Sequence, residues 1–182
     1  MPIKYVKTNR LNNFIKAVIW SIVLWIIILT PIIAFAGEKR DFPLRPAGHV
    51  IFCHYQPTEC SASQPARIAL DEKMMKTVEQ VNTKANARRY RAEKLDVWDN
   101  GNDCEDYAIR KRRSLRQAGI PDGAMRYAQG KVRGELHVVL IVRTEGGDMI
   151  LDNLTSKILP RKQSAVRLES METADPTVWT KI

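Results

Sequence analysis

The pattern of apolar and polar residues predicts two helices followed by a series of strands. Apolar residues recur at steps of three and four over about residues 68–90, which is the spacing of an amphipathic helix. A second helix is expected to start at Asn102 or Asp103, both good N-caps, and to end near Ala118. Gly119 suits the left-handed conformation that often follows a helix.

The residues after the second helix have the pattern of an antiparallel sheet. A strand is expected at about residues 125–131, and the β-branched run over 136–142 is typical of a strand buried on both faces. Residues 144–147 are a hairpin signal, with a return strand over 149–154. A further strand is expected near residues 164–168. Helices followed by an antiparallel sheet indicate an α+β fold.

The first 36 residues have the composition of an export signal. They contain four basic residues and no acid, and an uncharged apolar stretch runs from Ala17 to Ile33. Small residues at Ala34 and Ala36 complete the pattern of a Sec-type signal peptide cleaved after Ala36. An uncleaved membrane anchor is the alternative, since the stretch is slightly long for a signal and slightly short for a span. Both interpretations export residues 37–182 and predict a periplasmic location.

The net charge of +9 belongs only in part to the exported domain. Without the signal, the remaining 146 residues carry +5, which is mildly basic. The basic run Arg110–Arg113 is interpreted as a solvated helix face, because no aromatic interleaving or nucleic-acid motif accompanies it. Nucleic acid is therefore not expected as a partner. The apolar content of 45% excludes a disordered chain.

Export would place the three cysteines in an oxidising compartment. Cys53 and Cys60 are near neighbours and are expected to form a local disulfide in an irregular segment over residues 37–65. Its small loop limits the stabilisation to about 2 kcal/mol. A zinc site that also uses His54 is a weaker alternative, because the spacing matches no standard finger and a fourth ligand is missing. Cys104 is then left over, either buried and inert or reactive.

Three residues occupy positions that suit nucleophilic catalysis. Cys104 lies in the first turn of the second helix, where unpaired N–H groups favour a thiolate and can bind an oxyanion. His137 opens the long strand, and Asp152 interrupts the return strand of the same hairpin. A histidine near the thiol would act as base and then acid, and a carboxylate would fix its tautomer. Taken singly, the three also have ordinary explanations as a buried hydrophobe, a core histidine and a turn residue.

The hairpin geometry bears on this triad. His137 and Asp152 face each other directly only if Arg143–Gly146 form a four-residue loop. A tight turn at Gly146 and Gly147 would separate them by about four positions, roughly 13 Å along the strand. The triad hypothesis therefore predicts the wider loop.

Acidic residues flank the cysteine on both sides. Asp103, Glu105 and Asp106 can cap the helix and complement its dipole. Three carboxylates beside a thiol also raise its pKa, and a bound Ca²⁺ would cancel that charge through oxygen ligands of this kind. These three residues are therefore candidate calcium ligands.

Several blocks of the sequence resemble one known family. Residues 101–109 (GNDCEDYAI) resemble the nucleophile motif of the bacterial transglutaminase-like cysteine proteinases, which include periplasmic LapG-type proteases that release surface adhesins. Residues 137–144 (HVVLIVRT) and 147–154 (GDMILDNL) resemble the family's His and Asp block. The similarity extends over about residues 48–160.

The resemblance implies a papain-like, transglutaminase-like core over residues 66–182. It assigns the roles of nucleophile, base and orienting carboxylate to Cys104, His137 and Asp152. It also implies calcium at the acidic residues of the motif, a surface adhesin as protein substrate and an inner-membrane regulatory partner. Trp98 is expected in the core or the cleft wall, and related sites suggest its indole N–H as a weaker candidate for an oxyanion donor.

Three positions depart from the family's usual pattern. Asn102 and Leu136 stand where glycine is usual, and Val138 stands where alanine is common. These changes bear on specificity more than on the triad. The expected function is an exported cysteine peptidase that forms a thioester and hydrolyses it. An amidase or acyltransferase on the same triad is one alternative, and a catalytically silent binding domain is the other.

Overall fold

The computed structural model describes residues 15–16, 18–21 and 44–182. The predicted signal peptide and its cleavage point after Ala36 lie almost wholly outside the described residues and stay predictions. Among the described residues, no helix is long and apolar enough to span a membrane. All elements discussed below belong to the unit Pro43–Ile182.

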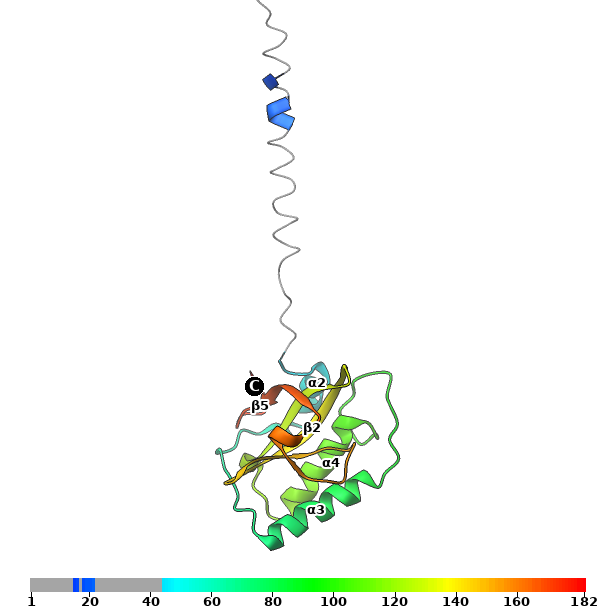
Figure 1. Cartoon of the computed structure of the whole chain (residues 1–182), viewed down its shortest axis with the longest axis vertical. Coiled ribbons are helices and arrows are strands. Elements are labelled where there is room, and N and C mark those ends of the chain that lie inside the picture. The colour runs from blue at the N-terminus through cyan, green and yellow to red at the C-terminus, as the bar shows by residue number, and fades with distance from the viewer. Residues whose placement is uncertain (1–14, 17, 22–43) are drawn as a thin grey trace, which may run out of the picture. The chain divides into compact units, whose positions relative to one another are not determined.

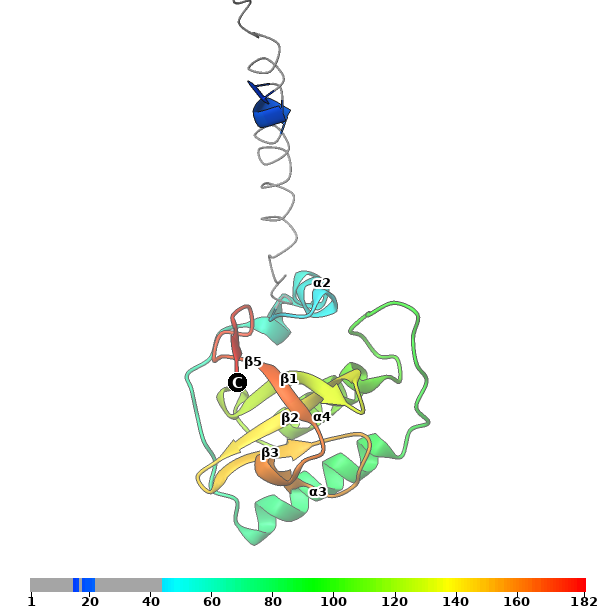
Figure 2. The ribbon, with the colours of Figure 1, turned by 45° about the horizontal axis from the view of Figure 1, so that its top comes forward.

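Helices packed on a six-stranded antiparallel sheet form this unit, so the predicted α+β class is confirmed (Figures 1 and 2). The helices are α2 (Ala47–Tyr55), α3 (Glu72–Asn86) and α4 (Cys104–Gln117). The strands are β1 (Met125–Val132), β2 (Glu135–Thr144), β3 (Gly147–Leu151), β4 (Leu159–Pro160), β5 (Arg167–Glu172) and β6 (Trp179–Lys181). Their order in the sheet is β4-β3-β2-β1-β5-β6. Helix α4 packs against β2, and α3 packs against α4.

Helix α4 matches the sequence expectation closely at both ends. Asp103 is its N-cap, and Gly119 after its C-terminus adopts a φ of +93°, as expected for a left-handed glycine. The interpretation of its basic run as a solvated face is wrong. Lys111 and Arg112 are 0% and 1% exposed, because α4 lies between the sheet and α3 and has two buried faces.

The long strand β2 is buried on both faces, as its continuous apolar run predicts. Val138, Leu140 and Val142 belong to the apolar cluster that includes the core side chains of α4. Val139 and Ile141 belong to a second cluster on the opposite face of the sheet. The alternation of strand side chains therefore distributes one unbroken apolar run between two cores.

The segment expected to be irregular contains a helix. Residues 47–55 form α2, and Pro57–Cys60 form a turn of 3-10 helix, so the expectation for residues 37–65 is wrong there. The short helix buries His49 and Phe52 on one face. The predicted disulfide between Cys53 and Cys60 is present.

The hairpin between β2 and β3 is tighter than the triad hypothesis required. Thr144 pairs with Gly147, which leaves two residues in the turn instead of four, so the prediction of the wider loop is wrong. Gly147 has a φ of +122°, which glycine adopts without strain and which lets the strands close early. In this register His137 and Asp152 are displaced by two positions from direct opposition. Such diagonal neighbours lie about 7–8 Å apart at Cα, within reach of long side chains.

Candidate active site

His137 and Asp152 form a buried pair in spite of the unexpected register. His137 Nε2 lies 2.7 Å from Asp152 Oδ1, and the two residues are 7% and 5% exposed. Asp152 follows the last residue of β3, and its carboxylate also accepts a hydrogen bond from the backbone N–H of Leu154. Burial alone raises the pKa of Asp152, but the hydrogen bond and charge of His137 hold it below its ordinary value. The pair is therefore suited to fix one orientation of the imidazole.

Helix α3 holds the backbone around Asp152 in place. Asn86 Nδ2 donates to the carbonyl oxygens of Asp152 and Thr155, each at 2.9 Å. One turn earlier, Asn82 Nδ2 donates to the carbonyl oxygen of Ser156 at 3.0 Å. The sequence pattern did not assign these asparagines a role, although polar residues on the inner face of an amphipathic helix are a signal for such contacts.

Lys111 lies beneath the pair, on α4. Its side chain is fully buried, and Nζ lies 3.4 Å from the carbonyl oxygen of Leu151, the residue before Asp152. Burial lowers the pKa of Lys111 to about 7, and the charge of Asp152 acts in the opposite direction. The structure thus shows that the ammonium group of Lys111 is buried together with its stem.

Cys104 is the first residue of α4 and is partly buried. Its Sγ donates to Glu105 Oε2 at 3.1 Å. Burial and the charge of Glu105 raise the pKa of the thiol far above its ordinary value, while a hydrogen bond with the backbone of Val138 acts in the opposite direction. Because α4 packs on β2, the thiol lies beside the strand that carries His137. Among the hydrogen bonds of the described residues, none joins Cys104 to His137.

Carboxylates cluster at the start of α4. Carboxylate oxygens of Glu93, Asp103 and Asp106 lie within 4.8 Å of one another. Asp106 accepts hydrogen bonds from the backbone N–H groups of Asp99 and Asp103, whereas the buried Oδ1 of Asp103 has no hydrogen-bond partner in the part of the chain that the structure describes. Burial, together with Asp106 and Glu105, raises the pKa of Asp103 to about 9.

This cluster differs from the predicted set of calcium ligands in one member, and the calcium assignment itself stays a prediction. Asp103 and Asp106 are in it, but Glu105 contacts the thiol, and Glu93 takes the third place. Glu93 comes from the connector before the helix, ten residues from Asp103. Its approach depends on the path of a loop, which no local pattern reveals.

Trp98 is a core residue, as expected, with 3% of its surface exposed. Its ring packs edge-on against Tyr127 and beside Phe52. The single indole hydrogen is donated to Asp96 Oδ1 at 2.9 Å. This arrangement does not support the hypothesis that Trp98 donates to an oxyanion.

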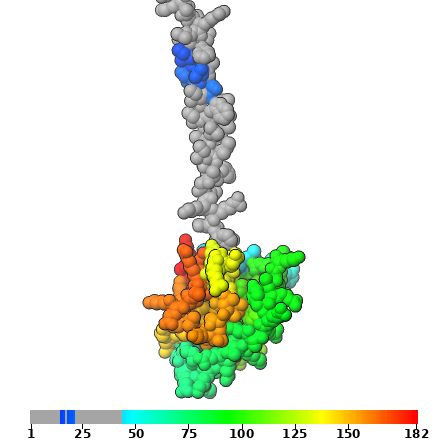
Figure 3. Space-filling model, turned by 45° about the vertical axis from the view of Figure 1, so that its right-hand side comes forward, coloured from blue at the N-terminus to red at the C-terminus, as the bar shows by residue number. Residues whose placement is uncertain are grey.

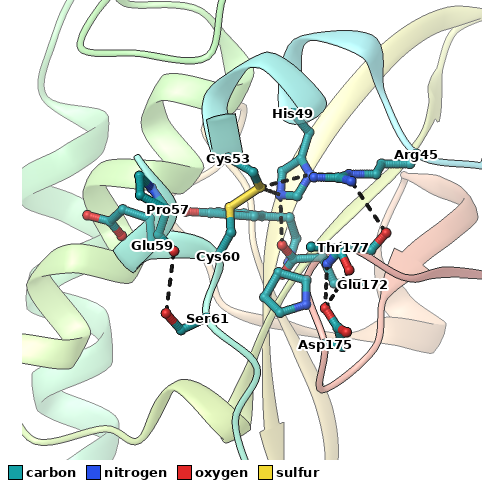
Figure 4. The surroundings of a disulfide bond; sticks show 12 residues. Arg45, His49, Cys53, Pro57, Glu59, Cys60, Ser61, Glu172, Asp175 and Thr177 are labelled. Atoms are coloured by element: carbon teal, nitrogen blue, oxygen red, sulfur yellow. Dashed lines mark hydrogen bonds and ion pairs between the residues drawn. A yellow bond between two sulfur atoms is a disulfide. The ribbon is translucent and has the colours of Figure 1, made fainter. Parts of the chain in front are cut away.

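The alternative zinc site at the N-terminal cysteines is excluded by their chemistry. The two sulfur atoms are joined to each other, and the histidine beside them is His49 rather than the predicted His54 (Figure 4). Figure 4 also shows His49 directed from α2 toward Glu172 of β5. His49 Nε2 is hydrogen-bonded to Glu172 Oε1 at 2.9 Å. The cluster around the disulfide is therefore structural.

Comparison with known proteins supports the fold and the family resemblance. Residues 40–182 match the family described as bacterial transglutaminase-like cysteine proteinase BTLCP. The calcium-bound structure of Legionella pneumophila LapG is similar at 27% identity and a TM-score of 0.51, over 55% of this chain and 65% of that one. The EGTA-treated structure of LapG gives 26% identity and a TM-score of 0.47, over 53% and 62%.

This chain thus covers less than two thirds of the LapG chain. No curated protein matches it. The family match covers most of the chain, including every residue of the candidate site. The chain belongs to the bacterial transglutaminase-like cysteine proteinase family.

Proposed function

We propose that this protein is a cysteine peptidase in which Cys104 is the nucleophile, His137 the base and Asp152 the orienting carboxylate. The observation that carries the proposal is the buried pair of His137 and Asp152, 2.7 Å apart, beside the helix start that bears Cys104. Asp152 engages Nε2, which leaves Nδ1 as the nitrogen that takes the thiol proton. The family match supports the chemistry.

The reaction follows from these positions. The Cys104 thiol leaves Glu105, gives its proton to His137 Nδ1 and attacks the peptide carbonyl carbon. Backbone N–H groups at the start of α4 stabilise the resulting oxyanion. His137 then returns the proton to the leaving amine, and a thioester remains on Cys104. Water, deprotonated by His137, hydrolyses the thioester and restores the thiol.

We propose further that a calcium ion binds the carboxylates at the start of α4. The residues fit such an ion, because three carboxylates converge there and the buried Oδ1 of Asp103 has no hydrogen-bond partner among the described residues. Asp103 and Asp106 would be ligands, with Glu93 from the structure and Glu105 from the sequence pattern as the further candidates. The bound ion would supply positive charge that favours the thiolate of Cys104. The calcium-bound state of LapG supports this assignment.

Alkylation of Cys104 by iodoacetamide tests both proposals on the full chain. With calcium at neutral pH, we expect Cys104 to react faster than a free thiol, and a chelator should slow it by at least about tenfold, which corresponds to one pKa unit. His137→Ala should also slow the reaction, and Glu105→Gln should partly restore it in chelator. His54→Ala is the matched control and should change nothing, since His54 lies in α2, away from the site. A rate equal to that of a free thiol, unaffected by calcium or by His137→Ala, would refute the triad.

We also propose export to the periplasm and a protein substrate at the cell surface. The basic and apolar pattern of the first 36 residues and the resemblance to LapG-type proteases support this. Surface proteins of cells with the wild-type chain should be compared by mass spectrometry with those of cells carrying Cys104→Ala. We expect at least one large protein to stay on the surface only in the variant. Identical surface proteomes would contradict the proposed substrate.

A further inference from the structure

A cavity of about 730 Å³ lies against the His137–Asp152 pair. Three segments of the chain form it: the residue Tyr90 after α3, the turn between β1 and β2, and the stretch that follows β3. Figure 3 shows the face of the molecule on which the green, yellow and orange segments meet. The apolar wall of the cavity is formed by Val132, Leu136, Ile150, Leu154, Leu159 and Ala165. The cavity therefore joins the reactive imidazole to an apolar surface.

Two leucines of this wall are exposed to solvent. Leu136, the neighbour of His137, is 53% exposed, and Leu154, two residues after Asp152, is 60% exposed. Single exposed leucines are common on protein surfaces. Here, however, both leucines line one cavity, and both are close in sequence to His137 or Asp152. They therefore expose apolar surface at the place where a substrate would bind. Glycine at position 136 would leave this part of the wall open, so the side chain of Leu136 helps to form it.

Charged groups do not dominate the cavity. Its lining includes the basic residues Arg133 and Lys157 and the acidic residue Glu135. Since both signs are present, the charges favour neither an acidic nor a basic substrate side chain. Apolar contact is the interaction that the wall offers.

The chemistry of the pair decides which half of a substrate reaches this cavity. In the proposed mechanism, His137 gives a proton to the leaving amine, so the residue that carries this nitrogen must lie against the imidazole. His137 and Asp152 line the cavity, whereas Cys104, which holds the acyl half, does not. The cavity is thus on the leaving-group side of the scissile bond.

We infer that this cavity is a subsite for a large apolar side chain on the residue that supplies the leaving amine. This inference rests on the proposed peptidase function and adds a substrate preference to it. Leu136 and Leu154 would be the residues that determine the preference, and neither takes part in the bond-making steps.

A random decapeptide pool tests the subsite with the full chain and calcium. Mass spectrometry of the products aligns all cleavage sites, and we expect Leu, Ile, Met or Phe to be enriched directly on the amine side. For single peptides that differ there by Leu or Gly, kcat/KM should favour Leu by about tenfold or more, which is the usual discrimination of an apolar pocket. The double variant Leu136→Ala, Leu154→Ala should lose this preference.

Leu95→Ala is the matched control, because Leu95 is 73% exposed and lies outside the cavity lining. It should keep the preference intact. An activated ester distinguishes the peptidase proposal from the subsite proposal. Its turnover needs Cys104, but its leaving group carries no amino-acid side chain that could enter the subsite. Suppose that the wild type turns over the ester. If its peptide cleavage then shows no apolar preference on the amine side, the subsite is refuted and the peptidase proposal stands. The same conclusion follows if the preference is present but survives in the double variant. If Cys104 does not turn over the ester either, both are refuted.

Discussion

Two groups of buried carboxylates adjoin helix α4, and they differ in what surrounds them. Glu172 is fully buried, and its oxygens accept hydrogen bonds from His49, from Arg112 in the middle of α4 and from the backbone N–H of Tyr127, each at 2.9 Å. At the start of the same helix, the carboxylate of Asp103 lies beside those of Asp106 and Glu93, and its Oδ1 has no hydrogen-bond partner among the described residues.

From this difference we expect a structural role for Glu172 and a ligand-binding role for Asp103. A buried charge that has a full set of partners lets the chain fold around it, and removing it leaves those partners without compensation. A buried cluster of like charges opposes folding unless a proton or a cation joins it. Glu172 is therefore expected to stabilise the fold, whereas Asp103 is expected to destabilise it until a cation binds.

Glu172→Ala should have the largest effect on stability. It would leave His49 and the guanidinium of Arg112 buried without their acceptor, so we expect the free energy of unfolding to fall by about 3–5 kcal/mol. Urea denaturation followed by tryptophan fluorescence measures this, with Glu169→Ala on the same strand as control. Glu169 is partly exposed and pairs only with Lys131 at 3.4 Å, so its loss should cost less than about 1 kcal/mol. Equal effects of the two substitutions would refute the structural role that we assign to Glu172.

Asp103→Asn should have a smaller effect of opposite sign. Because the pKa of Asp103 in the folded state is raised to about 9, its contribution to stability is present at low pH and is lost as the pH rises toward that value. Asparagine remains neutral and is an equally good N-cap. In chelator, the variant should therefore be more stable than the wild type by about 1–3 kcal/mol at pH 8, and by less at pH 5.

Calcium should reverse this order. The wild type should gain stability on addition of calcium at pH 8, seen as a rise in Tm, and Asp103→Asn should gain little. A variant that is less stable than the wild type in chelator at both pH values would show that the carboxylate of Asp103 has a structural role like that of Glu172.

The start of helix α4 could be predicted from sequence because its signals are local. Asp103, Cys104 and Gly119 act through capping and backbone conformation within a few residues, and the structure places all three as expected. The burial of β2 on both faces follows equally from one continuous run. Such signals need no knowledge of distant parts of the chain.

Other features depended on three-dimensional context. The positive φ of Gly147 allows a two-residue turn, which sets the register of the hairpin. Asp152 is therefore not directly opposite His137, but their side chains are long enough to form the hydrogen bond. Helix α2 is short and follows prolines, so its stability comes from packing of His49 and Phe52 rather than from propensity. Glu93 reached the acidic cluster through a loop whose path is not encoded in any periodic pattern.

The placement of His137 and Asp152 on one hairpin has a consequence for the order in which the site assembles. Their contact spans 15 residues and needs only a tight turn, whereas Cys104 precedes His137 by 33 residues. Hairpins form in about 1–10 μs, while contacts between distant segments must first overcome a larger loop-closure entropy. His137 and Asp152 can therefore come together early, and Cys104 joins them when α4 docks on β2. Assembly of the candidate site ends with one long-range folding step, and the thiol is the last of the three groups to arrive.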